Sequence, residues 1–197
     1  MSSDTLAQNP FERFREVLEE AQQTGIDDPN AMVVASCDEQ GRPSTRVVLL
    51  KDFDPRGFVF YTNLESRKGR QILANPEVSL NFYWRELGKQ VVIEGAAGLV
   101  SNEEADAYFA TRPRGSQLGA WASQQSRPME GRAQLLAEVA RHEVHYLTHK
   151  VPRPPHWSGF RVVPRYFEFW VAGTFRLHDR TVYELEGSSW RSYKVFP

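Results

Sequence analysis

The sequence predicts an α+β fold in which a mainly antiparallel β-barrel carries a few helices. Short runs rich in Val, Phe and Tyr recur along the chain, and turn residues such as DEQGRP and DFDPRG separate them. Only a few segments repeat their apolar residues at helical spacing. With 197 residues, 41% hydrophobic and 12% aromatic, the chain is most simply one domain with a substantial core.

The first element is an N-terminal helical segment, assigned to residues 1–29, with its helix at about 9–24. Asn9 is a candidate N-cap, Pro10 suits the first helical position, and Gly25 ends the helix. Further helices are expected at 66–75, 102–111 and roughly 129–149.

The strands are expected in two groups, joined through the last of these helices and a stiff proline-rich connector, VPRPPHW (151–157). The first group comprises 31–37, 45–52, 57–62, 78–84 and 90–100. The second group comprises 159–164, 166–171, 174–178, 180–185 and 190–196.

The charge balance and the cysteine count exclude several classes of function. Lys plus Arg (24) nearly equal Asp plus Glu (25), so neither nucleic acid nor an anionic membrane is predicted as a partner. The single cysteine, Cys37, excludes an intrachain disulfide and a multi-cysteine metal site. No apolar segment is long enough to span a bilayer, and the N-terminus lacks a secretory pattern, so a cytoplasmic protein is expected.

Common catalytic motifs are not found. His142, His145 and His149 fall on one predicted helix, but HEVH is one residue short of the HExxH zinc spacing, so a solvated helix face is expected there and no metal site. The nucleotide-binding patterns GxGxxG and GxxxxGK[ST] do not occur.

The run RVVLLK (46–51) is the first segment that suggests a binding site. Side chains alternate along a strand, so Arg46 and Lys51 are expected on opposite faces. The two cations either serve different anions or are strand-end charges in water.

The segment YTNLESRKGRQ (61–71) joins a strand to a helix that begins at about Ser66. Arg67 and Lys68 then fall in the first turn, where cations oppose the helix macrodipole. Free backbone N–H groups at this position favour phosphate. The segment is therefore either an anion site or a solvated basic turn.

The segment AYFATRPRGSQLGAWASQQS (107–126) gathers a phenol, a guanidinium and a hydroxyl. Tyr108 and Arg112 are four residues apart and share a helix face. Pro113 ends the helix, which leaves residues 114–116 in a loop. Such a group either holds a small phosphate through charge-assisted hydrogen bonds or is an ordinary helix end.

The segment EFWVAGTFRLHDR (168–180) is expected to place Arg176, His178 and Arg180 on one strand face. Three such groups repel each other unless an anionic or electron-rich ligand lies across them. Trp170 can flank an aromatic ligand. A surface ladder of charges is the alternative.

Together, these segments resemble the pyridoxamine/pyridoxine 5'-phosphate oxidase family. The match runs from about Asn30 to Trp190 in the family's order and spacing, and five motifs in register make it specific. The motifs are RVVLLK (46–51), FYTNLESRKG (60–69), YFATRPRGSQLGAW (108–121), the QS pair at 125–126, and EFW with RLHDR within 168–180.

The resemblance implies an FMN-binding split barrel over residues 30–197 that works as a homodimer, with FMN in the cleft between subunits. It implies FMN contacts at Arg46, Val47, Val48, Leu49, Leu50, Lys51, Tyr61, Thr62, Arg67, Lys68, Gln90, Gln125, Ser126, Trp170 and Arg180. It implies substrate contacts at Lys51, Tyr108, Arg112, Ser116, Arg176 and His178, the last two being the catalytic pair.

The implied reaction converts pyridoxamine or pyridoxine 5'-phosphate to pyridoxal 5'-phosphate, a step of vitamin B6 biosynthesis and salvage, with O2 as acceptor and H2O2 as product. Two alternatives remain: a sister flavin oxidase acting on another ring, such as those of phenazine pathways, and a non-catalytic binder of FMN or pyridoxal phosphate. The ending WRSYKVFP departs from the Arg-Leu-x-Pro tail common in the family, which leaves the C-terminal contacts open.

Overall fold

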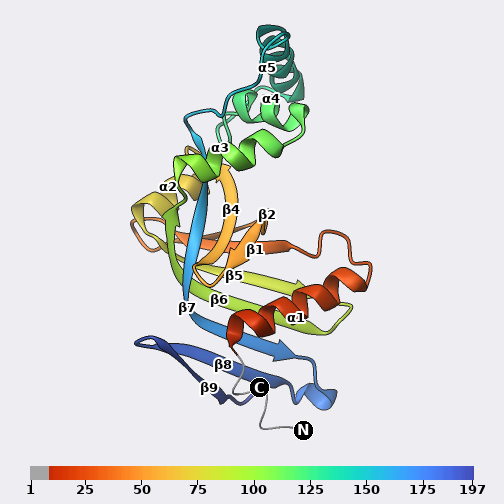
Figure 1. Cartoon of the computed structure of the whole chain (residues 1–197), viewed down its shortest axis with the longest axis vertical. Coiled ribbons are helices and arrows are strands. Elements are labelled where there is room, and N and C mark those ends of the chain that lie inside the picture. Colours follow the sequence, from red (N-terminus) through yellow and green to blue (C-terminus); the bar gives the residue numbers. More distant parts are fainter. Residues whose placement is uncertain (1–8) are drawn as a thin grey trace.

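The computed structural model describes residues 9–197, which form one curled antiparallel sheet with five α-helices around it (Figure 1). The helices are α1 (Pro10–Gln23), α2 (Arg67–Ala74), α3 (Asn102–Thr111), α4 (Arg114–Ala122) and α5 (Arg132–His145). The strands are β1 (Ala31–Cys37), β2 (Pro43–Leu49), β3 (Asp52–Asp54), β4 (Gly57–Asn63), β5 (Glu77–Trp84), β6 (Lys89–Leu99), β7 (Trp157–Val171), β8 (Asp179–Glu186) and β9 (Ser189–Lys194).

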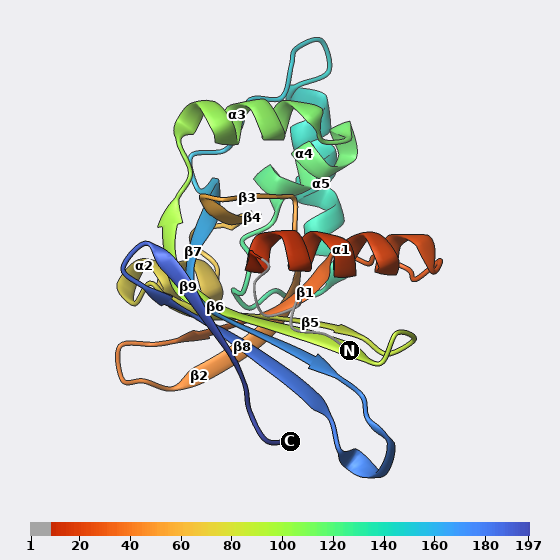
Figure 2. The same cartoon turned by 60° about the horizontal axis from the view of Figure 1, so that its bottom comes forward.

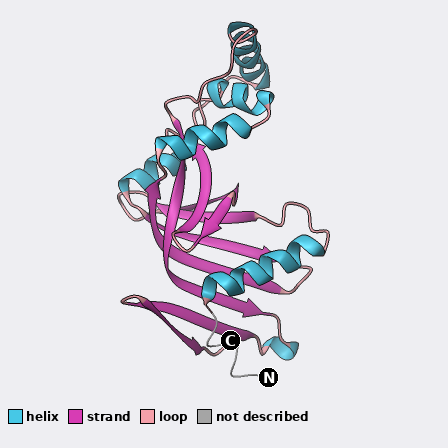
Figure 3. Ribbon diagram, in the orientation of Figure 1, coloured by secondary structure: helices cyan, strands magenta, loops and turns pink. Residues whose placement is uncertain are grey.

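The strands are hydrogen-bonded in the order β2-β1-β5-β6-β7-β4-β3, with β8 paired to β7 and β9 to β8. Every ladder among the described residues is antiparallel. Helices α3, α4 and α5 gather at one end of the molecule, as Figures 1 and 3 show. The predicted α+β fold with a curled, barrel-like sheet is confirmed.

The long strand β7 divides the sheet into two parts. Its first half pairs with β4, its second half pairs with β8, and β6 follows it along most of its length. A bulge interrupts the β6–β7 register between Glu94 and Gly95, opposite Arg165, and lets the strand bend. The predicted strands at 159–164 and 166–171 are therefore one continuous strand.

Helix α1 closes the barrel side of the sheet, and Figures 1 and 2 both show it lying against the strands. The predicted cap is present, since Asn9 Oδ1 accepts a hydrogen bond of 2.9 Å from Phe11 N. Phe14 is fully buried, and its ring centroid lies 5.0 Å from those of Phe53, Phe58 and Phe82. An aromatic cluster thus joins α1 to β3, β4 and β5.

The strand predicted at 174–178, which bears on the site, is wrong. Residues 174–178 are not a strand: a 3₁₀ turn, η2 (Thr174–Arg176), leads into a short loop, so Arg176, His178 and Arg180 do not share one strand face. Glycine is required at position 173, because an added Cβ would lie 1.9 Å from the Leu177 carbonyl oxygen.

The segment after Pro113 is helix α4, where a loop was predicted. Proline ends α3, but its carbonyl oxygen accepts hydrogen bonds from Ser116 N and Gln117 N and so begins the next helix. The bounds of two further elements differ from the prediction. The strand expected at 45–52 stops at Leu49, and the helix expected at 129–149 is shorter and is α5 alone.

Candidate functional site

A cavity of about 480 Å³ opens among β2, β4, β7, α2, α3 and α4, and we call it the cation pocket. It brings together most of the predicted site residues from three of the four motif segments. It is lined by Val47, Val48, Leu49, Lys51, Tyr61, Thr62, Asn63, Lys68, Tyr108, Arg112, Ser116, Gly119, Ala120, Ser123, Gln125 and Trp157.

The charge of this lining is one-sided. Lys51, Lys68 and Arg112 are cationic, whereas none of the described residues that line the cavity is Asp or Glu. Uncompensated cations repel one another and attract anions into a partly enclosed space. The cation pocket is therefore suited to an anionic ligand.

Local hydrogen bonds fix the turn that leads into α2. The helix begins where predicted, and Ser66 is its N-cap: the Ser66 hydroxyl accepts from Gly69 N at 3.1 Å and donates to Asn63 O at 2.7 Å. A side chain at Gly69 would collide with the Leu64 backbone, 2.3 Å from its Cβ position. Because the first turn holds no acidic residue, its free N–H groups and its cations point to the same kind of ligand.

Lys68 reaches from this turn into the cavity. Its Nζ donates to Thr62 Oγ1 at 2.9 Å and to Gln125 Oε1 at 3.0 Å, both neutral partners. Burial, together with the charge of Arg46, lowers the pKa of Lys68 to about 8. A bound anion would restore the favourable environment that the ammonium group lacks here.

Arg46 lies behind the lining and does not itself face the cavity. Its guanidinium donates to Ser36 Oγ at 2.7 Å, Ser44 Oγ at 2.6 Å and Val34 O at 3.1 Å. Its pKa is lowered by burial and then by Arg67. Arg46 and Lys51 thus point to different places, as predicted, but the reason is the end of β2 at Leu49 and not alternation along one strand.

Three stacked aromatic side chains line the cavity, and we call Tyr61, Tyr108 and Trp157 the aromatic wall. The rings of Tyr61 and Tyr108 are stacked with centroids 4.0 Å apart, and Trp157 stacks on Tyr61 at 5.2 Å. Glycine at position 159 makes this possible, because its missing Cβ would lie 2.8 Å from the Tyr61 ring. Burial raises the pKa of Tyr61 to about 12, so its phenol stays neutral.

Arg112 caps the C-terminus of α3 beside this wall. Its guanidinium carbon lies 4.8 Å from the centre of the Trp157 ring, a cation–π contact. Its Nη1 is buried and has no hydrogen-bond partner among the described residues. Burial lowers the pKa of Arg112. A buried, unpaired guanidinium nitrogen beside a cavity indicates a missing acceptor.

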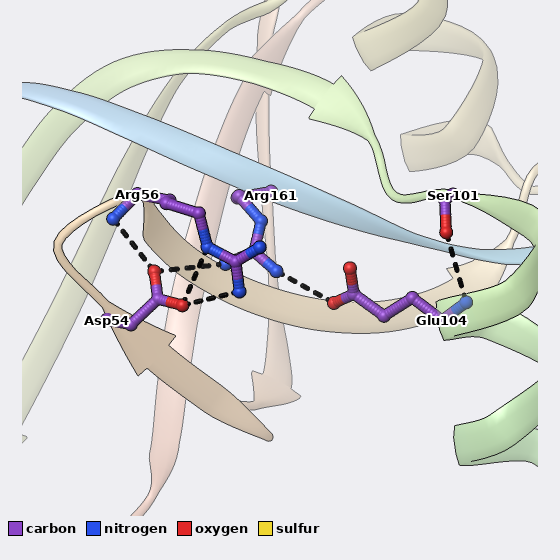
Figure 4. Close-up of polar contacts among 5 residues, drawn as sticks. All are labelled: Asp54, Arg56, Ser101, Glu104 and Arg161. Atoms are coloured by element: carbon purple, nitrogen blue, oxygen red, sulfur yellow. Dashed lines mark hydrogen bonds and ion pairs between the residues drawn. The ribbon is translucent and has the colours of Figure 1, made fainter.

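An ion-pair network holds α3 in place, as Figure 4 shows. Arg161 on β7 donates to Glu104 Oε1 at 2.8 Å and to Asp54 Oδ1 at 3.4 Å. Arg56 binds the same Asp54 from the solvent side at 2.6 Å. Ser101 caps the helix by accepting from Glu104 N at 3.1 Å. The network fixes the helix that carries Tyr108 and Arg112.

Five other predicted residues lie on β6, β7 and β8 or in the connection between β7 and β8, and we call them the edge patch: Gln90, Trp170, Arg176, His178 and Arg180. Gln90, Trp170 and Arg180 are direct neighbours across β6, β7 and β8. The Trp170 and His178 rings lie 4.6 Å apart, and His178 Nδ1 accepts from Gly173 N at 3.1 Å. None of the five lines the cation pocket of the same chain.

Arg180 is strongly paired, unlike the pocket cations. It binds both carboxylate oxygens of Glu168, at 2.7 and 2.9 Å, and donates to Phe196 O at 3.0 Å. The C-terminal tail therefore contacts the edge patch, although its sequence departs from the common family ending. Arg180, chiefly through its hydrogen bond, holds the pKa of Glu168 below its usual range.

Four predicted residues lie elsewhere. Leu50 is buried in the main core, Arg67 lines a small separate cavity with Gln71, and Arg46 lies behind the pocket as described. Ser126 follows Gln125 with a φ of 71°, an uncommon value for a residue other than glycine. Sequence reasoning missed Asn63, Ser123 and Trp157, which line the pocket. The strand-end position of Asn63 was the only available signal.

No metal site or membrane span stands out. The described residues contain no group of three His, Cys, Asp or Glu side chains that could hold a metal ion. His142 and His145 lie on α5 and contact the Tyr146 ring, whereas His149 lies beyond the helix. No helix in the described part of the chain is long and apolar enough to cross a membrane.

Fold and site together define an antiparallel split-barrel protein with a pocket for anionic, aromatic ligands. The family model described as "Pyridoxamine 5'-phosphate oxidase" matches residues 18–146, and that of the "Pyridoxine 5'-phosphate oxidase C-terminal dimerisation region" matches residues 157–197. The chain belongs to the pyridoxamine 5'-phosphate oxidase family. The second match confirms the predicted homodimer.

Similar proteins cover nearly the whole chain. A pyridoxine/pyridoxamine 5'-phosphate oxidase of Myxococcus xanthus (strain DK1622) is 58% identical over 96% of this chain and 92% of its own length. One from Rhodospirillum rubrum is 54% identical over 96% of each chain.

Among solved structures, PhzG from Burkholderia lata 383, in complex with tetrahydrophenazine-1-carboxylic acid, is 33% identical with a TM-score of 0.91, covering 96% of this chain and 93% of PhzG. A pyridoxamine 5'-phosphate oxidase-related, FMN-binding protein of Nostoc punctiforme covers each chain fully with a TM-score of 0.76. At 15% identity it shows the shared fold alone.

Proposed function

We propose that this protein binds FMN and oxidises pyridoxine or pyridoxamine 5'-phosphate to pyridoxal 5'-phosphate. The observation that carries the proposal is the cation pocket: within the described residues, Arg112 leaves a buried nitrogen without an acceptor, and no Asp or Glu lines the cavity beside its three cations. Two phosphate-bearing aromatic ligands would supply the missing anions and would use the aromatic wall.

The residues fit FMN at the α2 side of the pocket. The first turn of α2, with Arg67 and Lys68, and the guanidinium of Arg46 behind it offer donors and positive charge for a phosphate. Val47, Val48, Leu49, Tyr61, Thr62 and Gln125 line the space beside them. In the dimer, Gln90, Ser126, Trp170 and Arg180 would complete the site.

The residues at the α3–α4 side fit the substrate phosphate. Tyr108 and Arg112 come from the end of α3, and Ser116 comes from the first turn of α4. Together with Lys51 they provide hydrogen-bond donors and two positive charges to one end of the substrate. Anchoring the phosphate fixes the pyridine ring and lowers the entropic cost of reaching the reactive geometry.

When bound, FMN supplies the redox chemistry: it accepts two electrons from the substrate C4' carbon and passes them to O2. Pyridoxine phosphate and O2 then give pyridoxal phosphate and H2O2. Pyridoxamine phosphate also consumes one water and releases ammonia. The role of the protein is to bind and orient, with Arg176 and His178 covering the far side of the substrate ring.

The relatives support this substrate over the phenazine alternative. Curated proteins that are 58% and 54% identical carry the pyridoxine/pyridoxamine 5'-phosphate oxidase name, whereas PhzG is 33% identical. A ring that carries no anionic group would also leave the buried Arg112 unpaired. The expected cytoplasmic location remains a prediction.

Purified protein tests the proposal in two steps. The visible spectrum should show flavin bands at about one FMN per chain, and adding pyridoxine 5'-phosphate under air should yield pyridoxal phosphate and peroxide in equal amounts. A colourless protein that does not take up FMN would refute the cofactor. If the protein holds flavin but converts neither phosphate ester, it is a non-catalytic flavin-binding protein. If it converts only a phenazine precursor, it is the sister oxidase.

A further inference from the structure

A buried polar hub lies behind the α2 side of the cation pocket. Gln71 Oε1 accepts from Ser36 Oγ at 2.7 Å, from Ser44 Oγ at 2.8 Å and from Arg46 Nη2 at 3.4 Å. Gln71 is 6% exposed and Ser36 is 2% exposed. The hub thus ties β1, β2 and α2 together at the base of the turn that carries Lys68.

All hydrogen-bond partners of Arg46 in the described chain are neutral: two hydroxyls, one amide oxygen and one backbone carbonyl. Two other partly buried arginines, Arg161 and Arg180, differ from Arg46. Arg161 is paired with two carboxylates and Arg180 with one. A carboxylate beside a guanidinium cancels most of its field, whereas neutral acceptors orient the group and leave its charge available.

Without a carboxylate partner, the charge of Arg46 interacts unfavourably with neighbouring cations. The pKa of Arg46 is lowered by burial and by the charge of Arg67, and the pKa of Lys68 is lowered by burial and by the charge of Arg46. A folded chain keeps such a repulsive group where a ligand relieves it. A carboxylate at position 71 would have relieved it within the chain.

We propose that Gln71 is a positioning residue for the phosphate end of the flavin site. With Ser36 and Ser44 it holds the Arg46 guanidinium through uncharged hydrogen bonds, so that the full positive charge acts on the FMN phosphate. This inference rests on the proposed binding of FMN. Glutamine at position 71 supplies the geometry of a glutamate without its charge.

The sharpest test compares FMN with riboflavin, which has the same ring but no phosphate. Gln71→Glu keeps the size of the side chain and adds a carboxylate, so the dissociation constant of FMN from the apoprotein should rise about 10- to 100-fold. The dissociation constant of riboflavin should change by less than about 3-fold. Gln22→Glu, the same substitution at an exposed position of α1, serves as the control and should change neither.

Ser44→Ala provides a second variant should the buried charge prevent folding. It removes one hydroxyl from Arg46 without adding charge, at a partly exposed position. FMN affinity should fall about 3- to 10-fold while riboflavin affinity stays constant.

Unchanged FMN affinity in both variants would overturn the role of Gln71. So would an equal loss for FMN and riboflavin, since that indicates general damage to the fold. If the unaltered chain binds FMN more tightly than riboflavin and the variants keep the same ratio of the two dissociation constants, only this inference fails. If the unaltered chain binds neither flavin, the proposed function fails with it.

Discussion

The cation pocket and the edge patch both carry cationic or potentially cationic side chains, but they treat charge in opposite ways. In the pocket, Lys68 and Arg112 are partly buried and have no carboxylate partner in the described chain. In the edge patch, Arg180 is held by both oxygens of Glu168. Unpaired charge marks a place prepared for an anion, whereas paired charge marks a surface already neutralised.

The two regions also differ in how complete they are within one chain. The pocket is lined by six elements of a single chain. Four of the five edge-patch residues, all but Gln90, lie in the segment that matches the dimerisation region, and Phe175 beside Arg176 is 90% exposed with a φ of 57°. Arg176 also has a positive φ, 64°. We expect the partner subunit to contact these strained, exposed residues, because they lie in the segment that matches the dimerisation region.

The largest effect is expected in the pocket. Arg112→Ala should raise KM for pyridoxine 5'-phosphate by roughly 10- to 1,000-fold, because a charge-assisted contact of about 1.5–3 kcal/mol is lost and a phosphate charge is stranded. Steady-state kinetics measure this. Arg114→Ala is the matched control, since the exposed Arg114 donates to Tyr146 O and does not line the pocket. An unchanged KM would remove Arg112 from the phosphate anchor.

A substitution in the edge patch should lower the turnover rate without releasing FMN. Arg176→Ala should keep the yellow FMN and lower kcat/KM about 100-fold, because the substrate ring loses its cover and its alignment. The flavin-to-protein absorbance ratio and the turnover rate are measured together. Arg191→Ala, in a surface ion pair on β9, is the control. Purification of the Arg176 variant without flavin would show that the two ligand sets are wrongly divided.

The pH dependence of FMN binding should report on Lys68. With a pKa of about 8 in the apoprotein, Lys68 is charged at pH 7 and largely neutral at pH 9, so the dissociation constant of FMN should rise up to about tenfold across this range. Lys68→Arg should abolish the rise, because arginine stays charged. Titrations at pH 7, 8 and 9 measure it.

Lys68 also affects the stability of the apoprotein, which should increase with pH while the affinity for FMN decreases. The unfolded chain, with the usual lysine pKa of 10.5, binds more protons between pH 8 and 10.5 than the folded chain, so this contribution makes the apoprotein more stable as the pH rises. Unfolding of this origin cannot explain a weaker FMN affinity at pH 9. Affinity that is independent of pH would contradict the assignment.

The smallest effect is expected in the network that supports the pocket. Arg161→Ala leaves Glu104 and Asp54 without this partner and should destabilise the fold by about 1–3 kcal/mol, raising the substrate KM only a few-fold. Thermal unfolding measures the first value. Arg56→Ala, which removes an exposed partner of the same Asp54, should leave the melting temperature nearly unchanged. Equal shifts in the two variants would show that the network does not support α3.

Much of the local structure was predictable because it depends on neighbours in sequence. The N-caps at Asn9 and Ser66, the alternation along β1 and the cationic first turn of α2 all follow from side chains within a few residues of one another. The residues that the family motifs named likewise include most of those that line the pocket. The strand predicted at 174–178 was wrong, because the close approach of Gly173 to the Leu177 carbonyl oxygen overrides the strand-like composition of this segment.

The sequence by itself therefore determined the antiparallel fold, the family and the residue types available to the site. Tertiary structure decided which of these residues meet. Arg112 reaches Trp157 across 45 positions in the chain, and Gln71 holds Arg46 from another element. Periodicity and capping are local properties, whereas the partner of a buried charge is set by packing between distant segments, and no spacing along the chain encodes it.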